Sequence, residues 1–210
     1  MKALYARLAC LLLLTPFSSL AVPGQQRDLQ LTASVIAQQS CAVSEKMDAL
    51  RLTLQLRYTN AGKEKLILYK GNRLFFQIYI NRGGEDVAAA AAGRLELRTT
   101  HSRYFDEQPE KIAAPSPTGV FTTLSPGASY EIKQIISVPV ARDGEGRYNV
   151  SIGAGEHILS LTTSTWYESR KLAEDLRERW HARGFLWTEP LASNSVAFTI
   201  GKERSNLACQ

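Results

Sequence analysis

The segment 50–58 constrains the fold of this chain more than any other stretch. Its sequence, LRLTLQLRY, places an apolar residue at every second position, with Arg, Thr, Gln and Arg between them. Successive side chains of a strand point to opposite faces of a sheet, so this alternation is typical of a strand with one buried face and one wet face. The pattern therefore predicts a half-buried strand.

Short runs of apolar, aromatic and β-branched residues recur along the rest of the chain. They are separated by turn residues such as those at 60–63 and 125–127. The expected strands are 29–37, 50–58, 66–69, 74–80, 95–99, 120–124, 130–138, 148–152, 157–162 and 195–200. Pro139 is expected to end its strand, because proline cannot donate to a ladder. Short connections favour antiparallel pairing, so the pattern predicts a mainly β protein built as a sandwich.

Three segments are expected to be irregular. Residues 38–48 are interpreted as a polar connection. Residues 81–93 contain five consecutive alanines, a run too short for an independent helix, and we expect a long loop that holds one helical turn. Residues 101–118 contain three prolines and are expected to form a second long loop.

One helix is expected near the C-terminus, in a helical excursion over 164–193 between the last two strands. Thr165 and Glu168 have the spacing of a capping box, and Gly184 supplies a stop. Three large apolar residues recur every four positions on one face of this helix: Leu172, Leu176 and Trp180. The apolar run 185–187 is interpreted as a return toward the final strand.

The first 21 residues have the three parts of a secretory signal peptide. Lys2 and Arg7 precede the apolar run 8–14, and small residues at 19 and 21 suit cleavage after Ala21. The apolar stretch is too interrupted for a membrane-spanning helix, which needs about 20 apolar residues. Lipidation at Cys10 is disfavoured because Arg7 occupies a position where a lipobox has an aliphatic residue. We therefore expect a secreted or periplasmic protein.

Removal of the signal peptide sets the domain organisation and the charge. Residues 22–28 are expected to be a polar leader, 29–203 a single β-sandwich domain that includes the excursion, and 204–210 a C-terminal tail. The formal net charge of +5 includes Lys2 and Arg7, so the mature chain is less basic than the whole sequence. The basic stretch 170–183 is interleaved with acidic residues, which favours a solvated helix face over a nucleic-acid surface.

Two cysteines remain after cleavage, Cys41 and Cys209. In an oxidising compartment they allow one disulfide, and the alternative is two free thiols. We favour the disulfide, which would close nearly the whole domain. A loop of that length corresponds to roughly 4–5 kcal/mol in the chain-entropy model. The bridge requires the end of the first strand to lie near the end of the last one.

The turn 60–62 before the strand 66–68, and Leu124-Ser125-Pro126-Gly127 before the strand at Tyr130, resemble bacterial immunoglobulin-like sandwiches. The resemblance covers 29–140 and includes uncharacterised exported domains and bacterial proteinase-inhibitor domains. It implies an immunoglobulin-like antiparallel β-sandwich with one helical insertion near the C-terminus. No functional residue is carried over, since a fold by itself does not determine a function.

No pattern in the sequence indicates an enzyme, a metal site or a cofactor site. Zinc, phosphate-loop and nucleophile-elbow motifs are absent from the sequence. His101, His157 and His181 are interpreted as structural or surface residues. The acidic residues at 106, 107 and 110 are interpreted as a solvated turn, because they lack the spacing of a calcium loop.

The aromatic residues of the excursion are the best candidates for a binding surface. All three tryptophans lie within 166–187, and the candidate partner-binding residues are Trp166, Tyr167, Phe185 and Trp187. One interpretation is that these aromatics clamp the helix onto the sandwich. The other is that some of them stay exposed as anchors for a partner.

The sequence thus leaves three hypotheses about function. The first is a non-enzymatic interaction or structural module that binds an envelope or extracellular protein through the aromatic excursion. The second is a carbohydrate-binding module that uses exposed tryptophans. The third is a hydrolase or an inhibitor, and the missing nucleophile-base set counts against the hydrolase.

Overall fold

The computed structural model describes residues 28–70, 74–84, 94–100, 116–117, 119, 121–142, 147, 150–164, 170–202, 207 and 209. They form a mainly β protein with several antiparallel sheets and a helix near the C-terminus, which confirms the expected fold class at this level. The signal segment, the alanine run, most of 101–118 and the capping-box pair Thr165 and Glu168 lie outside the described residues. The domain boundaries at 29 and 203 stay a prediction.

Three sheets contain the described strands. The first has the order β1-β2-β7, the second β10-β8-β4-β5 with β11 also on β8, and the third β6-β3-β9. Their bounds are β1 Leu29–Ala42, β2 Met47–Asn60, β3 Leu66–Tyr69, β4 Phe75–Arg82, β5 Leu95–Thr100, β6 Phe121–Leu124, β7 Ser129–Ala141, β8 Gly155–Ser164, β9 Phe185–Leu186, β10 Leu191–Ala192 and β11 Val196–Ile200.

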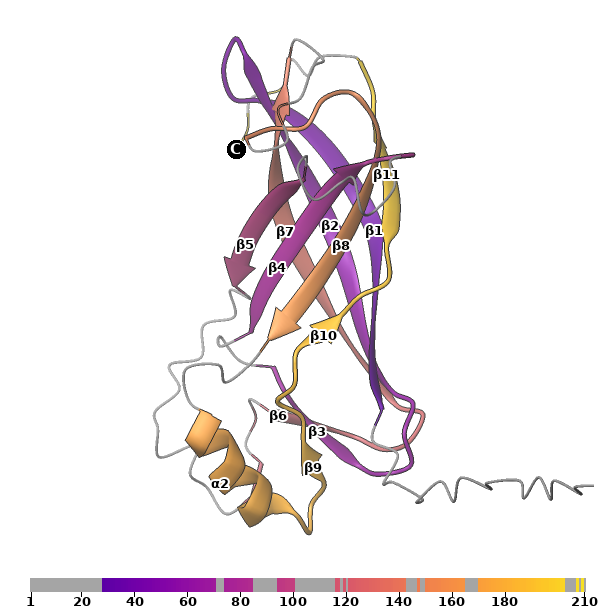
Figure 1. Ribbon diagram of the computed structural model, residues 1–210, viewed down its shortest axis with the longest axis vertical. Coiled ribbons are helices and arrows are strands. Elements are labelled where there is room, and N and C mark those ends of the chain that lie inside the picture. Colours follow the sequence, from indigo (N-terminus) through magenta and orange to yellow (C-terminus); the bar gives the residue numbers. More distant parts are fainter. Residues whose placement is uncertain are drawn as a thin grey trace, which may run out of the picture.

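The two larger sheets share one hydrophobic core. In Figure 1 the first sheet lies behind β5, β4, β8 and β11, and the inward residues of both sheets belong to a single buried cluster. The third sheet and the helix α2 (Arg170–Trp180) lie at one end of this pair. The layered arrangement buries one face of each large sheet and leaves the other face wet.

Strand β2 confirms the alternation seen in the sequence. Leu50, Leu52, Leu54 and Leu56 are fully buried, while the residues between them face outward. β2 pairs with β1 on one side and β7 on the other. It therefore forms the centre of its sheet, and pairing on both edges extends it beyond 50–58 at each end.

Strand β1 is longer than the sequence pattern indicates. It continues to Ala42, so the expected polar connection 38–48 is reduced to a turn at 43–46. A register shift between Val35 and Ala37 interrupts the alternation, after which exposed polar residues still pair with β2. From Ala37 onward, β1 is therefore maintained by its backbone pairing with β2, because its side chains there do not form an apolar face.

The prediction that Pro139 ends its strand is wrong, because β7 runs through it to Ala141. The Pro139 carbonyl accepts a hydrogen bond from the Ile152 amide at 3.0 Å. N and C=O of one strand residue point to the same edge, so the proline nitrogen also faces away from β2. Of the expected strand 148–152 the structure describes only 150–152, and there Ile152 forms an isolated parallel bridge with Val140 in place of a strand.

The excursion contains short strands that pair with the sheets, in addition to the helix that the sequence predicts. Ala173, Leu176 and Trp180 of α2 are buried, which confirms the apolar face. After the helix, β9 pairs with β3 in parallel and β10 pairs with β8 antiparallel. Two-residue strands are too short to produce a periodic pattern, so the sequence could not indicate them.

The expected disulfide between Cys41 and Cys209 is present, with 4.9 Å between the Cα atoms. The Ala42 amide donates to the Leu207 carbonyl beside it at 2.6 Å. The end of β1 therefore meets the chain that follows β11, as the bridge requires.

We expect the Cys41→Ala/Cys209→Ala double variant to lose about 2–5 kcal/mol of unfolding free energy, because the unfolded chain regains the entropy of a long loop. Urea denaturation of the oxidised protein and the variant measures this loss. The unfolding free energy of the wild-type protein in reductant should approach that of the variant. An oxidised wild-type protein that is no more stable than the variant would contradict the prediction.

Candidate functional site

The excursion is anchored by Trp180, the last residue of α2. Trp180 is fully buried, and its ring packs edge-on against Phe121 of β6 with 4.8 Å between the centroids. Phe121 in turn contacts Tyr69 of β3 at 5.3 Å. This row of three rings attaches the helix to the small sheet, so Trp180 serves as a clamp.

Arg177 connects α2 to the segment that follows it. Its Nε donates to the Leu186 carbonyl at 2.9 Å, and Nη2 donates to the Thr188 hydroxyl and to Glu189. The guanidinium also stacks over the Phe185 ring, 4.5 Å from its centroid. Partial burial would raise the pKa of Glu189, but the hydrogen bonds from Arg177 and the Thr188 amide hold it below its usual value.

Phe185 of β9 and Trp187, the residue after β9, flank the fully buried Leu186. Both are half-buried and pack against the core. The Trp187 indole nitrogen donates to the Glu189 carbonyl at 2.9 Å. Each ring is thus held in place while part of its surface stays in solvent. The other two predicted partner-binding residues, Trp166 and Tyr167, lie outside the described residues.

A hollow of about 470 Å³ lies beside Phe185. Its described lining contains three Lys or Arg residues and one carboxylate: Glu64, Lys65, Arg177, His181, Ala182, Arg183, Gly184 and Phe185. Lys65 and Arg183 are exposed, whereas Arg177 is engaged with β9 and Glu189. The hollow therefore presents net positive charge next to an aromatic side chain.

Gly184 allows the chain to turn from α2 into β9. Its φ is +146°, and a Cβ there would lie 2.8 Å from the Lys65 carbonyl oxygen. The Phe185 amide donates to that same oxygen at 2.8 Å. The predicted stop is confirmed, and its further reason is a close approach of backbone to β3 that the sequence does not indicate.

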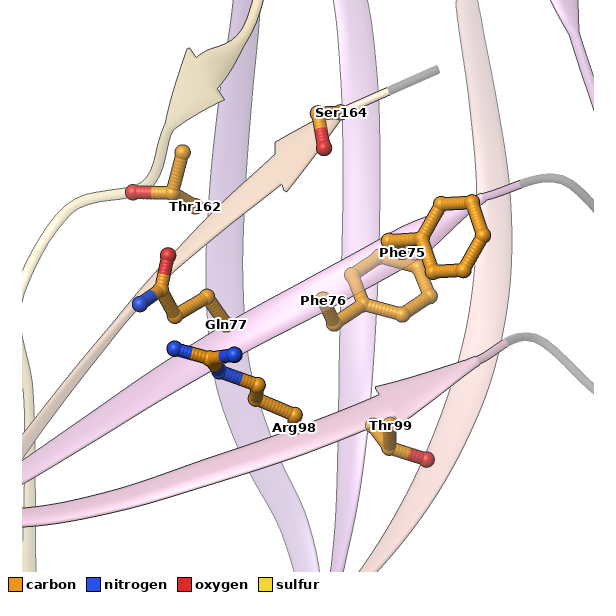
Figure 2. Close-up of a pocket in the computed structure, with 7 residues that line it drawn as sticks. All are labelled: Phe75, Phe76, Gln77, Arg98, Thr99, Thr162 and Ser164. Carbon is orange, nitrogen blue, oxygen red and sulfur yellow. The ribbon is translucent and has the colours of Figure 1, made fainter. Parts of the chain in front are cut away.

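A second hollow, of about 640 Å³, lies where β4, β5 and β8 run side by side (Figure 2). Gln77 of β4 pairs with Arg98 on one side and with Thr162 on the other. Phe75, two residues before Gln77 on β4, pairs with Ser164. Phe76 and Thr99 complete the described lining.

Glu96 holds two polar groups of this second hollow in place. Its Oε1 accepts a hydrogen bond from Gln77 Nε2 at 2.8 Å and from Arg98 Nε at 3.0 Å. These hydrogen bonds from Gln77 and Arg98 keep the pKa of the Glu96 carboxyl below its usual value. Sequence reasoning missed Gln77, Glu96 and Arg98 because they are ordinary solvent-facing residues of two strands that are separate in the sequence.

The histidines do not assemble a catalytic group in the described part of the chain. His157 is buried on β8, with Nε2 at 2.9 Å from the Gly153 carbonyl and its ring against Phe198. His181 is exposed after α2 and contacts the Glu178 carbonyl through Nδ1. His101 and the acidic residues at 106, 107 and 110 lie outside the described residues.

Within the described residues, no cluster of three His, Cys, Asp or Glu side chains is placed to hold a metal ion. The same residues include no helix of the length and apolarity needed to cross a membrane. Comparison with protein-family models, curated proteins and solved structures produced no match. Function therefore has to be inferred from the two hollows and their surroundings.

Gly184→Ala is expected to lower the unfolding free energy by about 1–3 kcal/mol, through a strained φ and a clash with Lys65. Chemical denaturation measures the loss. Gly127→Ala is the matched control, because Gly127 also has a positive φ of 77° but has open space around it. A larger loss at Gly127 than at Gly184 would contradict the close-approach argument.

Burial lowers the pKa of His157 below its usual range; the Gly153 carbonyl opposes this shift and the Arg82 charge adds to it. The unfolded chain then binds a proton more readily than the folded one. Neutral, buried His157 therefore contributes to the free energy of unfolding above about pH 6.5, and this contribution is lost as the pH falls through the lowered pKa. We expect His157→Gln to reduce the loss of urea-unfolding stability between neutral and mildly acidic pH. An unchanged pH dependence would contradict this.

Proposed function

We propose that the protein is an exported, non-enzymatic interaction module that binds a protein partner through the excursion 164–193. The observation that carries the proposal is the placement of Phe185 and Trp187. Both are half-buried, they flank the buried Leu186, and Phe185 borders the positive hollow. Large aromatic side chains that are held rigidly at a surface are favoured anchors for protein partners.

Rigidity supports this surface as a binding site. Trp180 fixes α2 to the small sheet, and Arg177 fixes the chain after β9 through Leu186, Thr188 and Glu189. A surface that is already ordered loses less conformational entropy when a partner binds. Trp166 and Tyr167 lie outside the described residues, and their part in binding stays a prediction from the sequence.

The charge around the hollow indicates the chemistry of the partner. Lys65 and Arg183 are exposed at its rim, Arg177 lies in its lining, and Glu64 supplies the one carboxylate of the described lining. Complementary charge guides association and selects partners. We therefore propose that the partner presents an acidic segment next to an apolar one.

Export is the other part of the proposal. The signal pattern at 1–21 directs the chain out of the cytoplasm, to the periplasm or the medium. The disulfide between Cys41 and Cys209 is of a kind that persists in oxidising compartments. An immunoglobulin-like sandwich is the proposed scaffold, supported by two large sheets around a shared core.

The tryptophan-based carbohydrate hypothesis receives less support. Trp180 is fully buried, and Trp187 is half-buried with its indole nitrogen bonded to Glu189. The two described tryptophans therefore do not form the exposed pair that stacking on sugar rings would need.

A photo-cross-linker at position 182, which lies in the hollow lining, is expected to capture a discrete envelope protein in producing cells. Reversal of charge in Lys65→Glu/Arg183→Glu should weaken the association at least about tenfold, because an acidic segment would be repelled. The thermal midpoint should stay the same, since both side chains are exposed.

A cross-linker at position 135 is the matched control, because Ile135 is 53% exposed on β7, outside the excursion. An adduct that forms equally from both positions would contradict the proposed surface. So would an adduct from position 182 that survives charge reversal. Trp187→Ala should reduce the same adduct, and retention at full yield would remove Trp187 from the binding residues.

A further inference from the structure

We propose that the hollow of Figure 2 binds a sugar that carries a carboxylate, such as a hexuronate unit. Its lining comes from β4, β5 and β8, whereas Phe185 belongs to β9 of the third sheet, so this proposal does not depend on the partner surface around Phe185. The described residues that carry the argument are Phe75, Gln77, Arg98, Thr162 and Ser164. Figure 2 shows the ends of Gln77 and Arg98 close together, with Thr162 on the neighbouring strand and Phe75 farther along β4.

Glu96 holds Arg98 in position and leaves some of its N–H donors unused. The Arg98 Nε donates a hydrogen bond to Glu96 Oε1 at 3.0 Å, and its Nη2 lies 2.9 Å from the same oxygen as an ion pair. The bonds among described residues leave Nη1 unused. A guanidinium held along one edge can still offer its remaining N–H groups to a second carboxylate.

The neighbouring groups supply the mixture of donors and acceptors that sugar hydroxyls require. Gln77 gives its Nε2 to Glu96, which directs the amide and leaves its oxygen as an acceptor. The hydroxyls of Thr162 and Ser164 line the hollow from β8, and each can donate or accept. Three strands paired in register hold these groups, so their spacing is set by the sheet.

The size and the apolar wall of the hollow also suit a sugar. A volume of about 640 Å³ is within the range of small-ligand sites. Phe75 provides an aromatic surface at one end, against which the C–H groups of a sugar ring can pack. A purely ionic ligand would make no use of this wall.

The unused edge of the Arg98 guanidinium, and not net charge, favours an acidic sugar over a neutral one, because Glu96 already balances the Arg98 charge. Arg98 is the one ionised side chain of the described lining, and it is 79% exposed, so a ligand can reach it. Arginine pairs with carboxylates through two parallel hydrogen bonds, which gives the site a geometric preference for that group.

The other large sheet contains a comparable trio of side chains. Gln55 Nε2 donates to Glu131 at 2.6 Å, and Arg57 Nε donates to Glu131 at 2.5 Å. These are the same residue types as Gln77, Glu96 and Arg98, and they line neither described hollow. Arg57→Gln therefore removes an equivalent surface charge without altering the proposed site.

Calorimetric titration of the mature protein with an oligogalacturonate, and with a neutral galactose oligomer of the same length, tests the proposal. We expect the acidic oligomer to bind at least about tenfold more tightly than the neutral one. Arg98→Gln should weaken it at least about tenfold, as expected for loss of charge-assisted hydrogen bonds. Arg57→Gln should leave binding unchanged, and Thr162→Val provides a second, uncharged change at the site that should weaken both oligomers.

Several results would overturn the proposal. They are an absence of binding at millimolar concentrations, equal binding of the neutral oligomer, and equal loss in Arg98→Gln and Arg57→Gln. Displacement of the oligogalacturonate by inorganic phosphate at equal affinity would also overturn it, because it would indicate a simple anion site. Unchanged circular dichroism of each variant confirms that any loss of binding is local.

Discussion

The burial of one row of leucines on β2 is the constraint on which the rest of the structure depends. Leu50, Leu52, Leu54 and Leu56 are fully inaccessible to solvent between the two large sheets. Complete burial of such a side chain contributes about 1.5–3 kcal/mol, so this row is a major part of the stability. Because β2 also pairs along both edges, the packing of either neighbour depends on its register.

The same core separates the two candidate surfaces. The excursion lies at the end of the molecule where α2 and the small sheet meet, and its position depends on Trp180 and Arg177 (Figure 1). The hollow with Arg98 instead belongs to the face of the second sheet that the core leaves wet. A buried aromatic contact thus supports one surface, while strand register supports the other.

Sequence reasoning succeeded where a local pattern coincides with burial. Strict alternation predicted β2, and the four-residue spacing on α2 predicted the burial of Leu176 and Trp180. It failed where pairing maintains structure without such a pattern: β1 beyond its bulge, β7 through Pro139, and the two-residue strand β9. In each of these cases the backbone partner, and not the side-chain sequence, decides the conformation.

The sequence by itself determined that the chain is mainly β, that a helix precedes the last strand, and that Cys41 and Cys209 can form a bridge. These properties follow from side-chain period and residue type, which act locally. Only the tertiary structure decided that Gln77, Arg98 and Thr162 converge, and that Arg177 reaches Glu189. Such juxtapositions depend on the pairing of distant strands and on helix docking. The sequence around one solvent-facing residue does not indicate which residue of another strand will lie beside it.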